Sequence, residues 1–307
     1  PVVALAAILH AAASCVLGPV IAAISLGLVG PRAIGERLGR NARFASLGNG
    51  VAAGVMGVVG YLVSSRAVFV VSFAFAGATL LALARIRDRE IDPEQAHGAI
   101  ARVEPDPDAT SVVHLLHQRP LVIFACTVFL LQFANAAMLP LMAGIVTERS
   151  SEGAPALIAL CIIVPQAIVA LISPSVGRKA QAWGRRPLLM IAFVALAVRG
   201  LLFATVHDPS LLVVVQVLDG VTAAVFGVMI PLIVADVAFG SGHFNLAQGV
   251  IGTATGIGAS LSTVVAGTMS DHFGHGVAFT GLAAAALSGL LVVWTLMPET
   301  RPAGLPR

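Results

Sequence analysis

VGRKAQAWGRRPLL, residues 176–189, carries four positive charges and no negative charge, and long apolar runs flank it on both sides. Elsewhere the chain is poor in charge, since 11% of its 307 residues are charged and 58% are hydrophobic. A soluble domain spreads its charged residues over a surface that water wets on every side. Charge gathered into short bursts between apolar runs is instead typical of a chain that crosses a membrane repeatedly.

Nine apolar runs are candidates for membrane spans. A bilayer core about 30 Å thick requires about 20 apolar residues in a helix. The runs are continuously apolar, where the strands of a membrane barrel would alternate, so they predict helices. The expected fold class is an all-α polytopic membrane protein with about nine transmembrane helices. The runs cover residues 1–29, 44–64, 67–85, 121–146, 156–176, 188–206, 211–239, 249–270 and 276–297.

The basic residues predict how the chain is oriented in the membrane. If the nine runs alternate in direction, fifteen of the eighteen Lys and Arg residues lie in loops on one side, and Arg66 and Arg149 lie on the other. Loops rich in Lys and Arg stay in the cytoplasm. We therefore expect a multi-pass protein of the inner or plasma membrane that starts outside and has a cytoplasmic C-terminus. Because Pro1 follows no signal sequence or earlier anchor, we also expect further sequence to precede it.

Two parts of the chain resemble each other weakly. HAAASCVLGPVIAAI (10–24) and GVTAAVFGVMIPLIV (220–234) share a pair of alanines followed by a glycine and a proline. A duplicated six-helix unit explains this register if the first copy lacks its front three helices. The expected domains are a partial N-terminal bundle of three helices at 1–86, a cytoplasmic linker at 87–120 and a C-terminal bundle of six helices at 121–307.

The stretch quoted above also carries a family resemblance. Gly177, Gly184, Arg185 and Arg186 occupy four positions of the loop signature of major facilitator superfamily (MFS) transporters. That signature reads Gly, three residues, Asp, a basic residue, one residue, Gly, Arg and a basic residue. Gln181 and Ala182 replace the Asp and the first basic residue. The chain therefore resembles an N-terminally truncated MFS transporter that begins in the family's fourth transmembrane helix.

The resemblance implies two pseudo-symmetric helical bundles, with the signature in the loop after the family's eighth helix. PETR, residues 298–301, after the last run also fits the family. The loop has two interpretations, a cytoplasmic topology anchor or a clamp in which Arg185 or Arg186 holds a neighbouring helix end in one conformation. Asp236, near the end of its run, is expected to be a solvated boundary acid; the alternatives are a cap on a cytoplasmic helix end and a pairing to Arg185.

Two charged residues lie deep within predicted spans, where a charge costs about 2.5–3.5 kcal/mol on insertion scales. Arg199 lies eleven residues from the inner end of its run, and Asp219 lies eight residues from the outer end of the next. At about 1.5 Å per residue, both reach nearly the same depth. We expect them to pair across antiparallel helices, either as a permanent ion pair or as a switch in which Asp219 takes up a proton and releases Arg199.

Three amide side chains are candidates for contact with a substrate. Gln132 and Asn135 share one helix face because they are three residues apart. Gln166 follows Pro165 about halfway along the next run. The resemblance places these two helices beside a central cavity, and broken or Pro-bent helices near the midplane are where transporters bind substrate. Hydrogen bonding between helices is the alternative role.

The function expected from this resemblance is secondary transport of a small organic molecule by alternating access, as proton-coupled efflux. The expected partners are the lipid bilayer, the small-molecule substrate and protons. Two alternatives stay open, an uptake symporter of the same family and a truncated membrane protein that does not transport. Because the sequence has no phosphate loop with a following Lys, no nucleophile elbow and no zinc-protease helix, we expect no enzyme activity, cofactor, metal or nucleic acid.

Overall fold

The computed structural model describes residues 2–64, 66–98, 118–149, 154–206 and 208–301. Every regular element within these ranges is a helix, which confirms the all-α class. Seven helical segments in the described part of the chain are long and apolar enough to cross a bilayer. The expected count of nine spans is therefore not confirmed.

The count differs because the first two apolar runs lie in one long helical element, as two segments that meet at a kink, and the third run forms a short helix. Helix α1, Val2–Leu62, continues through the basic stretch between the first two runs and is kinked at Gly30, whose φ is 68° and ψ is 176°. Arg and Ala, which both favour the helix, supply six of the 14 residues of this stretch, 30–43. The third run forms α2, Ala67–Leu83, whose 17 residues make it shorter than the seven spans.

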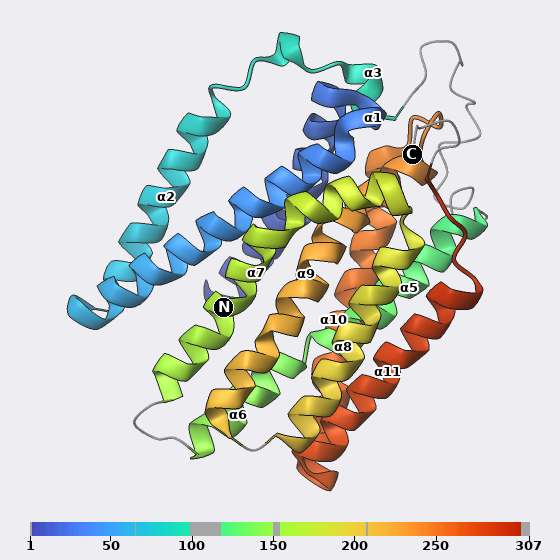
Figure 1. Cartoon of the computed structure of the whole chain (residues 1–307). Coiled ribbons are helices and arrows are strands. Elements are labelled where there is room, and N and C mark those ends of the chain that lie inside the picture. The colour runs from blue at the N-terminus through green and yellow to red at the C-terminus, as the bar shows by residue number, and fades with distance from the viewer. Residues whose placement is uncertain (1, 65, 99–117, 150–153, 207, 302–307) are drawn as a thin grey trace.

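The remaining helices form a bundle in which α8 packs against α9 and α11 while α5 packs against α10 (Figure 1). Helices α5 and α6 come from a single predicted run and together make one span. The bounds are α5 Arg119–Asn135, α6 Met138–Arg149, α7 Ala154–Trp183, α8 Arg186–Thr205, α9 Pro209–Val237, α10 Phe244–Phe273 and α11 His275–Thr295. We call the end that holds 30–43, 176–186 and 236–244 the basic end, and the opposite end the far end.

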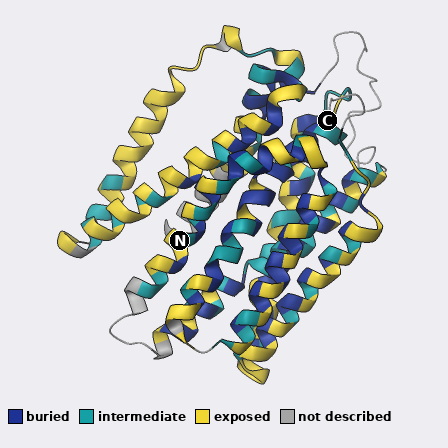
Figure 2. Ribbon diagram, in the orientation of Figure 1, coloured by how far each residue is buried: buried dark blue, intermediate teal, exposed yellow. Residues whose placement is uncertain are grey.

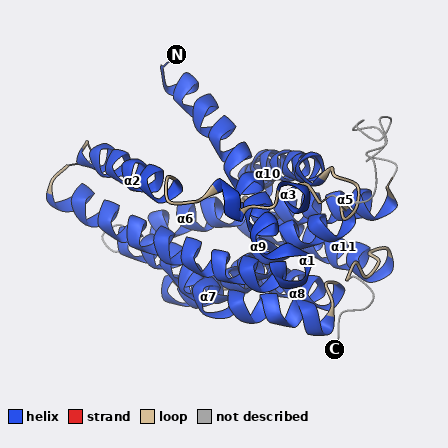
Figure 3. Ribbon diagram, turned by 90° about the horizontal axis from the view of Figure 1, so that it is seen from above, coloured by secondary structure: helices blue, strands red, loops and turns tan. Residues whose placement is uncertain are grey.

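Burial is concentrated in this bundle. Figure 2 shows dark-blue positions along α8 and α9, whereas α2 and the second half of α1 are largely exposed. No residue of α2 is buried, and its Phe73 is 80% exposed. The view from above in Figure 3 shows α2 and the start of α1 projecting from the bundle. Large apolar side chains on such a surface suit contact with lipid.

Part of the expected linker is folded against both halves of the chain. After a short 3-10 turn at Asp88–Glu90, helix α3 covers Pro93–Ala96. The Asp92 N–H donates to Gly27 O of α1 over 3.1 Å, and the Gly240 N–H donates to Gly98 O over 2.6 Å. Hydrogen bonds from the Gln95 backbone and side chain lower the pKa of the Asp92 carboxyl that caps α3. Residues 99–117 of the linker lie outside the described part.

Helix α7 crosses α1 at the basic end through small residues. A Cβ at Gly177 would lie 2.2 Å from Gly35 O, and a Cβ at Gly39 would lie 2.6 Å from Ser173 O. Gly35 and Gly39 are four residues apart on α1, and Ser173 and Gly177 are four apart on α7. Small residues at this spacing let two helix backbones approach closely. Gly177 therefore lies inside α7, because the helix continues to Trp183, and only Gly184 and Arg185 form the turn.

This crossing predicts a specific intolerance of a methyl group. Gly177→Ala is expected to lower the free energy of unfolding by about 1–3 kcal/mol, since the added Cβ meets backbone that must move. Gly252→Ala is the control, because nothing lies within 4 Å of a Cβ there. The control is expected to be neutral or stabilising by about 0.5–1 kcal/mol. Tryptophan fluorescence during heating measures both, and equal midpoints would contradict the prediction.

Candidate functional site

The apolar run 121–146 is broken near its middle. Helix α5 ends at Asn135 and α6 begins at Met138. Pro140 explains the break, because its ring clashes with the carbonyl four residues earlier, at Ala136, and offers no N–H to bond it. The Ala137 N–H, freed by the break, donates to Ser262 Oγ of α10 over 3.1 Å. A discontinuous helix whose freed backbone is satisfied by a neighbour is the arrangement found at transporter binding sites.

Arg199 and Asp219 meet beside this break. The Arg199 side chain is 1% exposed, and its Nη1 donates to Asp219 Oδ1 over 2.5 Å and to Asn135 Oδ1 over 2.6 Å. The guanidinium also lies over the Phe203 ring, 5.3 Å from its centroid. The cluster thus joins α5, α8 and α9. Because the Asp219 side chain is 19% exposed, one face of this buried pair stays accessible from outside the packed bundle.

The packing of α8 against α9 holds the pair in register. Thr222 lies one helical turn from Asp219 toward the basic end, and its hydroxyl donates to Ala192 O of α8 over 3.3 Å. Gly200, next to Arg199, allows close packing, since a Cβ there would lie 2.9 Å from Met138 Cε and 3.0 Å from Ala283 Cβ. Gly200 therefore brings α8 close to α6 and α11 at the level of Arg199.

The three candidate substrate residues are arranged unequally. Asn135 belongs to the cluster, whereas Gln132 faces the crossing with α10, where a Cβ at Gly258 would lie 3.2 Å from Gln132 Cβ. Gln166 is half-buried on α7, next to Pro165, whose carbonyl would lie 3.0 Å from a Cβ at Gly220 of α9. Among described residues, the structure joins neither Gln132 nor Gln166 to the cluster by a hydrogen bond.

A second charged cluster closes the basic end. The Arg185 side chain is 1% exposed; its Nε donates to Asp236 Oδ2 over 2.8 Å and its Nη1 to Ala180 O over 2.7 Å. Asp236 is 6% exposed, so the expectation of a solvated boundary acid is wrong and its alternative, the pairing to Arg185, is correct. The physical reason is that α7 turns sharply into α8 at Gly184 and points the Arg185 side chain inward.

The PETR segment completes this cluster. Glu299 accepts from the Arg185 N–H over 2.8 Å and from the Arg186 N–H over 3.2 Å, so it caps the start of α8. Gly184, with a φ of 95°, leaves room for the carboxylate, because a Cβ there would lie 2.4 Å from Glu299 Oε2. Arg186 itself donates to Trp294 O at the end of α11. The signature loop therefore ties together the basic ends of α8, α9 and α11.

Three residues of these clusters were missed by the sequence interpretation. Ser262 accepts at the helix break, Gln216 lies one turn from Asp219, and Glu299 caps α8. Gln216 has a readable signal, because it is three residues from Asp219 and shares its helix face. Ser262 has none, since its role depends on which helix packs beside the break. Among the described residues, no group of three His, Cys, Asp or Glu side chains is placed to hold a metal ion.

Comparison with known proteins decides the family. Residues 125–306 match the family model described as Major Facilitator Superfamily. Two uncharacterized MFS-type transporters of Mycobacterium tuberculosis, from strains CDC 1551 / Oshkosh and H37Rv, are each 41% identical over 289 residues, which is 94% of this chain and 69% of theirs. The chain belongs to the major facilitator superfamily. As an MFS member it is a multi-pass integral membrane protein and a transmembrane transporter, with the bilayer and a small molecule as its partners.

Proposed function

We propose that this MFS protein is a secondary active transporter that exports a small organic molecule in exchange for protons, by alternating access. The observation that carries the proposal is the hydrogen-bonded cluster of Asn135, Arg199 and Asp219 at the α5–α6 break. A charged pair inside a membrane span is expensive and usually serves an ion or substrate pathway. Here Asp219 is the partly exposed acid that exchanges a proton, and Arg199 is the partner that it releases on protonation.

The proposed substrate contacts are Asn135 with Gln132 and Gln166. Asn135 supports this role directly, because its amide oxygen accepts a hydrogen bond from Arg199, the residue that Asp219 releases when it is protonated. Gln132 and Gln166 support it by position, on the helices that flank the break and the α7–α9 crossing. Amide groups both donate and accept hydrogen bonds, which suits a neutral or zwitterionic polar group on the substrate.

We further propose that the basic end faces the cytoplasm of a cell membrane, with residues 1–86 and 121–307 as the two moving bundles and 87–120 as their linker. The bias of Lys and Arg supports this orientation. The crossing of α7 with α1 and the bonds of Arg185 support a closed cytoplasmic side in the conformation described. Alternating access then requires both to separate when the transporter opens inward.

The test is proton flux in proteoliposomes that hold an internal pH-sensitive dye. With ethidium as an organic cation and carboxyfluorescein as an organic anion, the wild-type protein is expected to couple movement of at least one probe to proton flux. Asp219→Asn is expected to abolish the coupling, because the amide cannot exchange the proton. Asp271→Asn, at an exposed position near the end of helix α10 at the far end, is the control and is expected to retain it. Unchanged coupling in Asp219→Asn would refute the role of this acid.

A further inference from the structure

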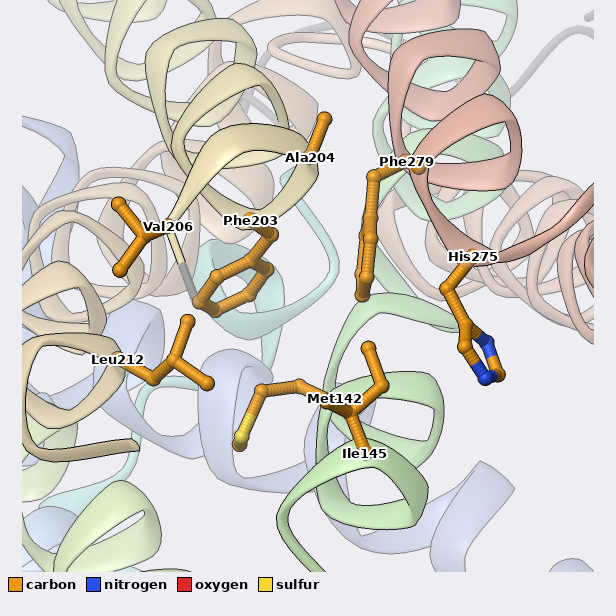
Figure 4. A pocket seen from close by; sticks show the side chains of 9 residues that line it. Met142, Ile145, Phe203, Ala204, Val206, Leu212, His275 and Phe279 are labelled. Carbon is orange, nitrogen blue, oxygen red and sulfur yellow. The ribbon is translucent and has the colours of Figure 1, made fainter. Parts of the chain in front are cut away.

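A small cavity of about 60 Å³ opens at the far end of the bundle, between α6, α8, α9 and α11 (Figure 4). Most of its lining is apolar, with Met142, Phe203, Leu212 and Phe279 around it. Among the described lining residues, the polar side chain is His275 at the start of α11, and its Nδ1 lies 2.6 Å from Ser270 Oγ. Since a water molecule takes up about 30 Å³ in the liquid, the volume suits about two waters.

Two polar side chains lie one helical turn beneath the floor of this cavity. Arg199 is four residues from Phe203 on α8, and Gln216 is four residues from Leu212 on α9. Four residues correspond to about 6 Å along a helix. The Phe203 ring, which lines the cavity, lies directly against the Arg199 guanidinium. The floor is therefore about one side chain thick at this point.

A second contact leads from the cavity to the same level. Met142 of α6 lines the cavity, and its Sδ atom lies 3.9 Å from the Cys161 thiol of α7. The Gln216 amide lies beside that thiol but does not reach it with the geometry of an ordinary hydrogen bond. Arg199 and Gln216 thus belong to one buried level that Phe203 and Met142 separate from the cavity.

This level holds polar atoms that no described protein group satisfies. The Gln216 side chain is fully buried, and both its Oε1 and its Nε2 lack a partner among the described residues. The Arg199 Nε atom, also buried, lacks one within the same part of the chain. Buried polar groups are almost always hydrogen-bonded, and ordered water serves where protein does not. The Gln216 amide both donates and accepts, and the Arg199 Nε–H donates at the same depth in the bundle, so together they offer groups of the kind that bind buried water.

We propose that Gln216 and the Nε atom of Arg199 bind water, and that the far-end cavity is the mouth of a hydrated path that reaches them. Phe203 and Met142 form the constriction between mouth and binding site. The path runs inside the bundle of α5 to α11 and does not use its crossing with α1. Within the described part of the chain, the titratable groups beside it are His275 of α11, Cys161 of α7, Arg199 of α8 and Asp219 of α9.

This inference deepens the proposed function and rests on it in one respect. If the far end faces outward, the path carries protons from outside to Asp219 while the substrate uses the space between the bundles. Water bound at Gln216 lies one helical turn from Asp219, so a proton passes through it and then to the carboxylate that Arg199 releases. The water site itself stands on the contacts above, whatever the direction of transport.

Radiolytic hydroxyl labelling of the full protein in lipid nanodiscs tests the path directly. Radicals formed from bound water oxidise the side chains that touch it, even where bulk solvent is excluded. Met142 and Cys161 are 0% and 1% exposed, and Met229, which is 0% exposed, is the matched control. We expect oxidation of Met142 and Cys161 to be several-fold faster than that of Met229. Rates as slow as that of Met229 would overturn the path.

Gln216→Leu provides a second, independent readout. If the amide binds water, the apolar isostere removes that water, so oxidation of Cys161 falls and the thermal unfolding midpoint does not rise. If the amide is dry, the substitution removes two unsatisfied buried atoms and raises the midpoint, which contradicts the inference. The labelling result does not depend on transport. The two proposals can therefore fail separately. If the proposed function is wrong, Cys161 is still labelled but proton flux is unchanged in Asp219→Asn. If the hydrated path is wrong, Cys161 is not labelled.

Discussion

Replacing Arg199 with Met is expected to destabilise the protein by about 3–5 kcal/mol, the range measured when one partner of a buried ion pair is removed. The Arg199 side chain is 1% exposed and its Nη1 serves both Asp219 and Asn135. Its loss leaves a carboxylate and an amide oxygen in a low-dielectric interior, with one donor fewer for each. Thermal unfolding in detergent, followed by tryptophan fluorescence or by retention of the monodisperse peak after heating, measures the loss.

The double variant Arg199→Met/Asp219→Leu separates stability from function. Replacing a buried pair with apolar residues of similar volume is often neutral or stabilising. The double variant is therefore expected to recover most of the stability lost in Arg199→Met, while proton coupling stays absent. Val198→Met, at a 42% exposed position of the same helix, is the control for methionine and is expected to be neutral. If the double variant is no more stable than Arg199→Met, the stability lost in the single variant does not come from breaking the Arg199–Asp219 ion pair.

Arg185→Met is expected to cost about 3 kcal/mol, the lower end of the range for a broken buried pair, because this pair lies near the membrane boundary where water relieves part of the penalty. Asp236 loses both guanidinium bonds and, among the described residues, keeps the hydrogen bond from the Thr300 hydroxyl, 3.3 Å away. Glu299 is unaffected, since it accepts from the backbone N–H groups of the α8 start.

The functional consequence of Arg185→Met follows from its place at the basic end. Because Arg185 ties α9 to the turn between α7 and α8, its loss is expected to make that end open more readily. Accessibility of a thiol placed at Ala180→Cys, a 0% exposed position one turn from Gly177 on α7 that already carries a Cβ, measures this opening by its rate of alkylation. Arg178→Met, at an exposed residue of the same signature, is expected to change neither stability nor alkylation. Equal rates in the two variants would exclude a role for Arg185 in closure.

The part of the candidate site that could be predicted from the sequence is the part fixed by how deep each residue lies in its membrane span. The rise of a helix per residue places Arg199 and Asp219 at one level, and the cost of burying each charge favours their contact; the structure joins them over 2.5 Å. The break at Asn135 also has a local cause, because Pro140 follows it. Gln166 shows the limit of this reasoning, since its depth on α7 does not by itself bring it to the cluster.

The sequence by itself determined the all-helical membrane fold and its charged end, because hydropathy and the positive charge of loops act residue by residue and need no knowledge of neighbours. Only the tertiary structure decided that α1 is two helical segments joined at a kink, that Ser262 satisfies the α5–α6 break and that Asp236 is buried against Arg185. It also decided that Gln216 and Arg199 Nε have no hydrogen-bond partner among the described residues. Each of these depends on which helix lies beside which. Burial and hydrogen bonding between distant segments are properties of packing, and packing is set by the whole bundle.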